Sequence, residues 1–296
     1  MTTMERRYLD RLPRYEWPGG ARIAVVMQIP FELSDQGAGT PIEGQRSTIV
    51  PTLPSDILAA GHRDALAESM EAYGGEVGMW RLIDLLDRHQ VSATGVFSGL
   101  TAERYPDVLR AFLKGAGTRE ICCHSWGQDV RSYRLSKEDF RSTVRRCVEA
   151  IEKATGYRPV GWVSPGASFL TSVVEVLAEE GFLYQGDYAN NDSGDVVSVA
   201  GKQLVRMSVP WDINDLFLYA QSYNPPSSFV EAFQRSFDIL YQEGGQVVAA
   251  AAHASVFGRP LGIWAMEQCI IYAKSHSDVW FGTRAEIADA ILAQSN

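Results

Sequence analysis

Short apolar runs alternate with amphipathic segments of helical period along nearly the whole chain. The apolar runs predict strands at residues 22–29, 92–97, 120–124, 160–164, 183–187, 202–209, 247–253 and 279–283. The segments between them predict helices at residues 64–73, 77–89, 101–114, 136–155, 171–181, 228–242, 260–274 and 285–292. Continuous apolar strands interleaved with amphipathic helices are typical of a largely parallel sheet that helices cover.

About seven such β/α units follow one another without a break in composition, which favours one barrel domain over residues 1–296. A doubly wound sheet is the alternative, although no glycine-rich phosphate loop supports the nucleotide site of such a fold. The polar stretch 34–61 has no periodicity and is predicted to be a long loop. Whether this loop closes over a site or contacts another subunit stays open.

Charge and cysteine content narrow the range of partners and compartments. The net charge is −9, and an acidic chain without clustered positive charge predicts that neither nucleic acid nor a membrane is a partner. Residues 1–20 contain no apolar segment of the kind that secretory signals carry. The four cysteines show no disulfide or zinc spacing, so we expect a reducing, cytoplasmic compartment.

Chemically active side chains follow several of the predicted strands. In parallel β/α folds the active site forms at the carboxyl ends of the strands, which singles out Glu32, His124 and His253. Further candidates for substrate contacts at strand ends are Trp126, Gln128, Asp129, Ser164, Asp187 and Trp211. Each also has a structural interpretation: a histidine can be a satisfied buried residue, a tryptophan a core anchor and an aspartate a turn former.

The remaining residue types restrict the chemistry. No serine stands in a G-x-S-x-G turn, and no cysteine has the context of a nucleophile. One carboxylate and two histidines remain, a set that suits activation of a water molecule and protonation of a leaving group. This combination predicts hydrolysis without a covalent intermediate.

Five segments resemble the polysaccharide deacetylase family of the NodB-homology type. They are WPGGARIAVVMQIPFE, GYRPVGWVSP, GFLYQGDYANND, AAHASVFGRP and YAKSHSDVWFGTRAEIAD. The most similar branch contains metal-independent allantoinases, cyclic-imide hydrolases and peptidoglycan deacetylase-like proteins. The resemblance spans nearly the whole chain and implies a distorted (β/α)7 barrel and a homotetramer.

The resemblance also assigns roles to individual positions. The family's base, metal carboxylate, two metal histidines and late acid histidine fall, in that order, on Pro30, Glu32, His124, Gln128 and His253. A family arginine falls on Val163. Because an amide is a poor replacement for a histidine ligand, we expect no required cofactor. A divalent metal such as Zn²⁺, held by Glu32 and His124 with the help of Asp129, is the alternative.

These observations predict a hydrolase that acts on a carbon–nitrogen bond, other than a peptide bond, in a small amide. The side-chain amide of Gln128 presents both a donor and an acceptor, which favours a cyclic ureide, imide or lactam as substrate. Two alternatives stay open. One is a metal-dependent carbohydrate or peptidoglycan N-deacetylase, and the other is a catalytically inactive relative that binds a ligand, which Pro30, Gln128 and Val163 favour.

Overall fold

The apolar run near the start of the chain forms a strand that pairs with three other strands of the sheet. This strand, β1, covers Ile23–Phe31, and all nine of its residues are buried. The strand β8 (Gln246–Ala251) pairs with β1 over Ile23–Gln28. Burial on both faces explains why β1 reads as a continuous apolar segment rather than an alternating one.

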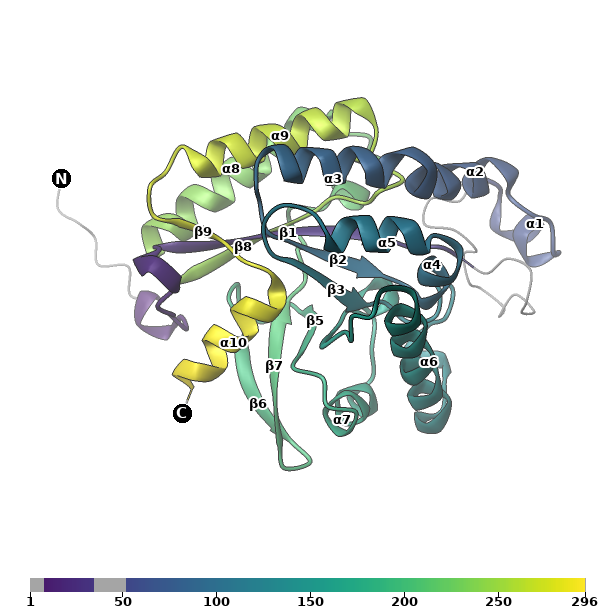
Figure 1. Ribbon diagram of the computed structural model, residues 1–296, viewed down its shortest axis with the longest axis horizontal. Helices are drawn as coiled ribbons and strands as arrows, with labels where there is room; N and C mark the ends of the chain where they lie inside the picture. Colours follow the sequence, from purple (N-terminus) through teal and green to yellow (C-terminus); the bar gives the residue numbers. More distant parts are fainter. Residues whose placement is uncertain (1–7, 35–51, 296) are drawn as a thin grey trace.

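The computed structural model describes residues 8–34 and 52–295, which form one curled sheet with helices around it (Figure 1). The further strands are β2 (Ala93–Phe97), β3 (Arg119–Cys123), β4 (Gly161–Trp162), β5 (Tyr184–Tyr188), β6 (Asp195–Val199), β7 (Lys202–Ser208), β8 (Gln246–Ala251) and β9 (Val279–Phe281). Their order is β6-β7-β5-β4-β3-β2-β1-β8, with β9 also paired to β1. All pairs are parallel except β6 with β7.

The curled sheet is an incompletely closed barrel, which confirms the predicted fold class. Its two end strands do not pair along their length, and an isolated bridge between Asn214 and Ala251 joins the seam near its top. The hairpin of β6 and β7 was not expected, because the sequence predicted a loop before residue 202. Its strand β6 is only partly buried, so it lacks the apolar run that marks the central strands.

Helices cover the sheet on its outer side. They are α1 (Ser55–Ala59), α2 (Ala65–Tyr73), α3 (Met79–Arg88), α4 (Gly99–Arg104), α5 (Pro106–Leu113), α6 (Lys137–Thr155), α7 (Thr171–Glu179), α8 (Pro226–Glu243), α9 (Pro260–Lys274) and α10 (Arg284–Gln294). In Figure 1, α3, α8 and α9 lie together over β1 and β8, and α10 lies beside β7. Two π-helical turns, Gly74–Gly78 and Leu216–Gln221, adjoin α2 and precede α8.

Local signals explain where several helices begin and end. Ser136 caps α6 by accepting a hydrogen bond from the Asp139 amide, and Gly156 ends that helix in a left-handed conformation, both as expected from the sequence. The single helix predicted over 101–114 is wrong: it is divided into α4 and α5 at Pro106, and Ser98 rather than Thr101 is the cap. Proline restricts the residue before it, here Tyr105, to a non-helical conformation.

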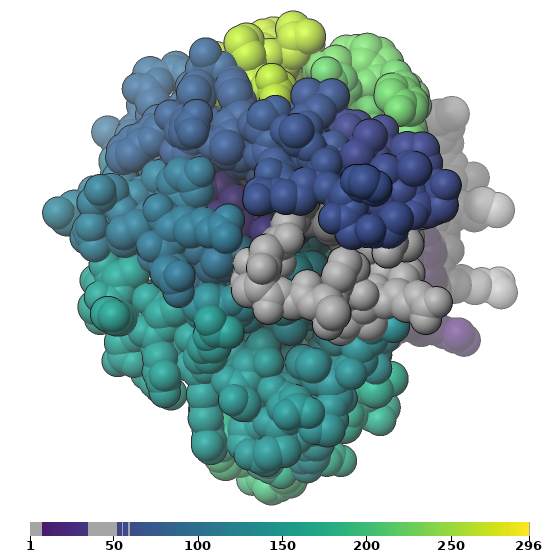
Figure 2. Space-filling view, turned by 90° about the vertical axis from the view of Figure 1, so that its right-hand side faces the viewer, coloured from purple at the N-terminus to yellow at the C-terminus, as the bar shows by residue number. Residues whose placement is uncertain are grey.

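The predicted long loop 34–61 lies only partly within the described residues, since 35–51 fall outside them. The part that is described contains the short helix α1, so this portion of the stretch is not a loop. Among residues 8–34 and 52–295, no helix has both the length and the apolar character that crossing a membrane requires. β1 runs toward α1 and α2, and Figure 2 shows the molecule from that side.

Candidate active site

The three strand-end residues singled out by the sequence come together at the carboxyl edge of the barrel. Glu32 follows β1, His124 follows β3 and His253 follows β8, and each is at least 95% buried. Oε1 of Glu32 lies 2.9 Å from Nε2 of His124 and 3.9 Å from Nε2 of His253. One carboxylate oxygen therefore faces both imidazole rings.

Backbone hydrogen bonds between neighbouring strands fix this arrangement. The amide of His124 donates to the carbonyl of Phe97 at the end of β2, and the amide of Ala254 donates to the carbonyl of Pro30. The amide of Gln128 donates to the carbonyl of Leu33. These bonds connect the segments that follow β1, β3 and β8 beyond the ends of the strands, and they hold the three side chains close together.

The imidazole of His124 faces an oxygen atom at both nitrogens. Its Nδ1–H donates to the carbonyl of Val163 at 2.8 Å. Its Nε2 lies 2.9 Å from Oε1 of Glu32 and 2.9 Å from Oε1 of Gln128. Because a carbonyl and a carboxylate only accept hydrogen bonds, this geometry is satisfied when the ring carries both protons. His124 and Glu32 then form a buried ion pair.

Glu32 is held in its ionised form. Burial by itself would raise its pKa, but the nearby His124, His253 and Arg131 outweigh this effect and lower the pKa to about 2. Oε1 is occupied by His124, whereas Oε2 is buried and has no hydrogen-bond partner among the described residues. A buried carboxylate oxygen without a partner is costly unless a ligand or water completes it, so Oε2 marks the position for a donor group.

His253 is oriented by an aspartate that the sequence did not single out. Asp215 is fully buried and accepts hydrogen bonds from both the amide and Nδ1–H of His253, at 2.8 Å and 2.6 Å. Burial lowers the pKa of His253, but Asp215 and then Glu32 raise it above its ordinary value overall. Asp215 thus favours the charged form of the ring and directs its Nε2 toward Glu32.

The signal that could have revealed Asp215 is weak. It belongs to the segment Trp211–Asp215, which contains two aspartates and follows β7, and sequence alone did not distinguish its acidic residues. The bridge between Asn214 and Ala251 brings this segment to β8, whose next residues lead into His253. Only the closure of the barrel seam makes Asp215 a neighbour of His253.

Ser164 and Asp187 bind each other rather than standing free for a substrate. The amide and the hydroxyl of Ser164 donate to the two oxygens of Asp187, both at 2.7 Å, and Gln185 donates to the same carboxylate at 2.8 Å. Burial raises the pKa of Asp187. This pair joins the end of β4 to β5. It lies next to Val163, whose carbonyl accepts a hydrogen bond from His124, so the pair helps to position His124.

Trp126 does not line the barrel mouth. Its ring lies against Gly99 of α4, and the guanidinium of Arg146 of α6 stacks over it at 3.3 Å from the ring centre. The predicted contact of Trp126 with substrate is therefore not supported. Gln128 and the half-buried Asp129 remain in the loop beside His124, as the sequence predicted.

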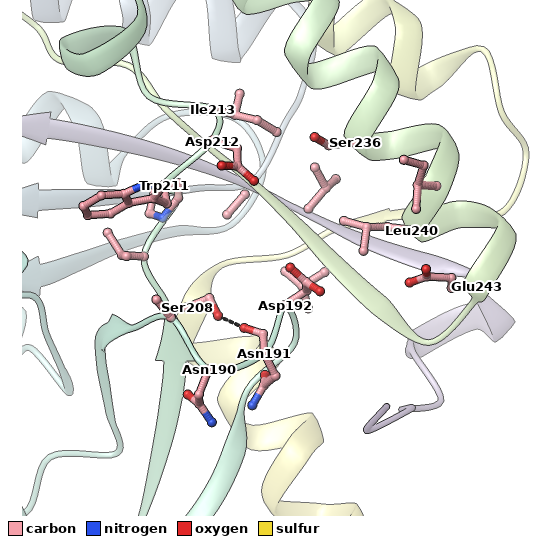
Figure 3. A pocket seen from close by; sticks show the side chains of 17 residues that line it. Asn190, Asn191, Asp192, Ser208, Trp211, Asp212, Ile213, Ser236, Leu240 and Glu243 are labelled. Carbon is pink, nitrogen blue, oxygen red and sulfur yellow. Dashed lines mark hydrogen bonds between the residues drawn. The ribbon is translucent and has the colours of Figure 1, made fainter. Parts of the chain in front are cut away.

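Trp211 lies in a separate cavity of about 530 Å³ at the seam of the barrel (Figure 3). The ring is 61% exposed, and the cavity lies between the segments that follow β5 and β7, the helix α8 and the outer part of β8. None of Glu32, His124 and His253 lines it. The predicted role of Trp211 in the same site as these residues is not supported.

The donor set does not suit a divalent metal of the kind that the family resemblance implies. Glu32 and His124 are the carboxylate and imidazole that such a site would use, but the third position holds the amide of Gln128. Within residues 8–34 and 52–295, no three His, Cys, Asp or Glu side chains are grouped as metal ligands. Zinc sites in proteins take three or four such ligands, so the residues present do not fit.

Comparison with known proteins agrees with this geometry. Residues 72–184 match the polysaccharide deacetylase family. A probable polysaccharide deacetylase from Pseudomonas aeruginosa PAO1 is 28% identical in a structural superposition that covers 95% of both chains, with a TM-score of 0.83. The structure of PuuE allantoinase is 28% identical, with a TM-score of 0.82 and coverage of 97% of this chain and 96% of the other. A putative polysaccharide deacetylase from Schizosaccharomyces pombe is 24% identical over 94% of this chain and 92% of its own.

The fold, the strand-end carboxylate and histidines and these comparisons all show that the chain resembles the polysaccharide deacetylase family. The resemblance found in the sequence is thus confirmed, including the branch that contains the allantoinase. The chain is accordingly a hydrolase of carbon–nitrogen bonds other than peptide bonds.

Proposed function

We propose that this protein hydrolyses the carbon–nitrogen bond of a small amide, in particular a cyclic ureide, imide or lactam. The observation that carries the proposal is the partner-free Oε2 of Glu32, buried beside two histidines that together offer an acid and a fixed cation. The likeness to PuuE allantoinase over nearly the whole chain supports a cyclic substrate.

Glu32 positions the water molecule in this proposal. Oε1 of Glu32 and Nε2 of His253 are 3.9 Å apart, too far for a direct hydrogen bond but close enough for one oxygen atom to bond both. A carboxylate with a pKa of about 2 is a weak base, so its main contribution is orientation. As the water oxygen bonds to the substrate carbonyl carbon, Glu32 accepts the proton that the water releases.

His253 protonates the leaving nitrogen. Asp215 holds its ring through Nδ1, so Nε2–H is the proton available to the site. When the carbon–nitrogen bond breaks, this proton passes to the nitrogen, and the proton on Glu32 then restores His253. His124 stays protonated beside Glu32 and, with Gln128, binds the substrate amide next to the reacting carbonyl. For a cyclic substrate both products are groups of one opened chain: a carboxylate, and an amine from a lactam, an amide from an imide or a urea group from a ureide.

This chemistry needs no metal ion in our proposal, because the water is polarised by charged side chains rather than by a Lewis acid. The second candidate is a metal-dependent N-deacetylase of carbohydrate or peptidoglycan, which the family match and the deacetylase names of two relatives favour. Gln128 argues against it. We also propose a cytoplasmic homo-oligomer, a tetramer by family resemblance.

The test is hydrolysis of a panel of amides by metal-stripped protein, with and without added Zn²⁺. The panel contains allantoin, hydantoin, succinimide, dihydrouracil and an N-acetylated chitooligosaccharide, and ring opening is followed by loss of the cyclic compound. Ring opening without metal that disappears in His253→Ala supports the proposal. Deacetylation of the oligosaccharide only with Zn²⁺ would establish the second candidate, and no turnover of any compound would favour an inactive relative.

A further inference from the structure

The loop after β3 brings a second cation to the mouth of the barrel. Arg131 follows Gln128 by three residues, and the loop is fixed at two points on either side of it. The amide of Gln128 donates to the carbonyl of Leu33 at the end of β1. The hydroxyl of Ser132 donates to the carbonyl of Ser168 in the segment after β4 at 2.9 Å. Arg131 is therefore held between the ends of β1 and β4.

The guanidinium of Arg131 lies directly against Gly166. A β-carbon at this glycine would overlap with Nη1 of Arg131. Gly166 also has a φ of +67°, in the left-handed region that favours glycine. A side chain at residue 166 would therefore displace the guanidinium from its present position beside Gly166.

The guanidinium of Arg131 is a charged group at the mouth that has no partner among the residues that the structure describes. Glu32 pairs with His124, and Asp215 pairs with His253. Over residues 8–34 and 52–295, the guanidinium of the half-buried Arg131 makes neither a hydrogen bond nor an ion pair. Its charge contributes, after those of His124 and His253, to the lowered pKa of Glu32. For contrast, the buried Arg284 donates to Oε1 of Gln28 at 2.8 Å and to the carbonyl of Ser208 at 2.9 Å.

We propose that Arg131 binds a carboxylate group on the amide substrate and so selects anionic over neutral substrates. A guanidinium presents two parallel N–H donors that match the two oxygens of a carboxylate, and pairs of this geometry are among the strongest hydrogen bonds in proteins. Glu32 and Asp215 each pair with a histidine, and Asp187 is hydrogen-bonded to Ser164 and Gln185. Among the described residues the guanidinium of Arg131 has no such partner, so a carboxylate on the substrate would supply one. This inference rests on the proposed function, since it specifies the substrate of the same site.

The test uses matched pairs of cyclic amides that differ by one carboxylate: dihydrouracil with dihydroorotate, hydantoin with hydantoin-5-acetate, and 2-pyrrolidinone with pyroglutamate. Dissociation constants are measured by calorimetry on the full chain, so the result does not depend on turnover. The variants are Arg131→Gln, Arg131→Lys and Gly166→Ala. Gly156→Ala is the control, because Gly156 also has a positive φ of +75° but no atom lies within 4 Å of its missing β-carbon.

We expect the wild-type protein to bind the carboxylate member of at least one pair at least about tenfold more tightly than the neutral member. This preference should vanish in Arg131→Gln, remain in part in Arg131→Lys, and fall in Gly166→Ala but not in Gly156→Ala. Equal binding within every pair, no binding of any probe, or an undiminished preference in Arg131→Gln would overturn the inference. An Arg131-dependent preference without hydrolysis of any member would leave the inference standing and contradict the proposed hydrolysis instead.

Discussion

Oε1 of Glu32 and Nε2 of His124 lie 2.9 Å apart, and both side chains are almost completely buried. A buried carboxylate and imidazole at this distance stabilise each other's charged form, which offsets the cost of removing both from water. The pairing uses one oxygen of Glu32 and leaves the other, Oε2, without a partner in the described part of the chain. The same ion pair therefore holds the carboxylate ionised and directs its second oxygen toward a ligand.

Replacing Glu32 with Gln should abolish most of the activity. The change keeps the shape of the side chain but removes the charge that holds the water, so we expect kcat to fall by about 10²- to 10⁴-fold, the usual range for such groups. Steady-state kinetics on the best substrate of the panel measures the effect. Glu103→Gln, which alters an exposed carboxylate on α4, serves as control. Unchanged turnover in Glu32→Gln would rule out the assigned role.

Replacing Asp215 with Asn should shift the pH dependence as well as lower the rate. Asp215 raises the pKa of His253, and His253 acts as an acid, so activity is lost as the pH rises through that pKa. Without the negative charge the pKa of His253 falls, and the alkaline limb of kcat/KM should move to lower pH. Asp212→Asn, in an exposed residue three positions away, should leave the limb in place. An unmoved limb in Asp215→Asn would exclude His253 as the acid.

The Glu32 ion pair should make the fold sensitive to acid. The pKa of Glu32 is about 2 in the folded protein, against an ordinary value of 4.5. A carboxyl whose pKa is lowered by folding stabilises the protein above its unfolded pKa, and this contribution is lost as the pH falls toward the folded pKa. It amounts to an order of 3 kcal/mol in the free energy of unfolding.

Urea denaturation of wild type and Glu32→Gln at several pH values checks this expectation. The difference in unfolding free energy between the two proteins should shrink as the pH falls from 4.5 to about 2. Comparing the two proteins removes the contributions of Asp187 and Asp215, whose pKa values burial raises in both. A difference that stays constant over this range would show that Glu32 is not the titrating group.

Metal dependence should follow the residue at position 128. Wild-type protein is expected to keep its activity after treatment with a chelator and to bind Zn²⁺ weakly. Gln128→His places a second imidazole four residues after His124 and close to Glu32, which completes three ligands of the types that zinc prefers. Calorimetry should then detect tight Zn²⁺ binding, whereas Gln128→Ala should bind no better than wild type. Complete loss of wild-type activity on chelation would contradict metal independence.

Much of the site could be predicted because it lies where strands end. Glu32, His124 and His253 each follow an apolar run, and parallel strands bring their carboxyl ends to one edge whatever the loops do. The same rule also predicted substrate contacts for Trp126 and Trp211, which the structure does not place beside these three residues. Sequence places a residue after a strand but does not give the direction of its side chain, and these rings turn toward the helices and the seam.

The sequence by itself determined the alternation of buried strands and amphipathic helices, and hence the class of fold. It also determined the carboxylate and the histidines at the strand ends, because local runs of apolar residues predict where each buried strand begins and ends. Only the tertiary structure decided that Asp215 orients His253, that Ser164 and Asp187 bind each other, and that the guanidinium of Arg131 lies against Gly166. These contacts join segments distant in the chain, and they depend on how the loops and the barrel seam pack, which no local pattern specifies.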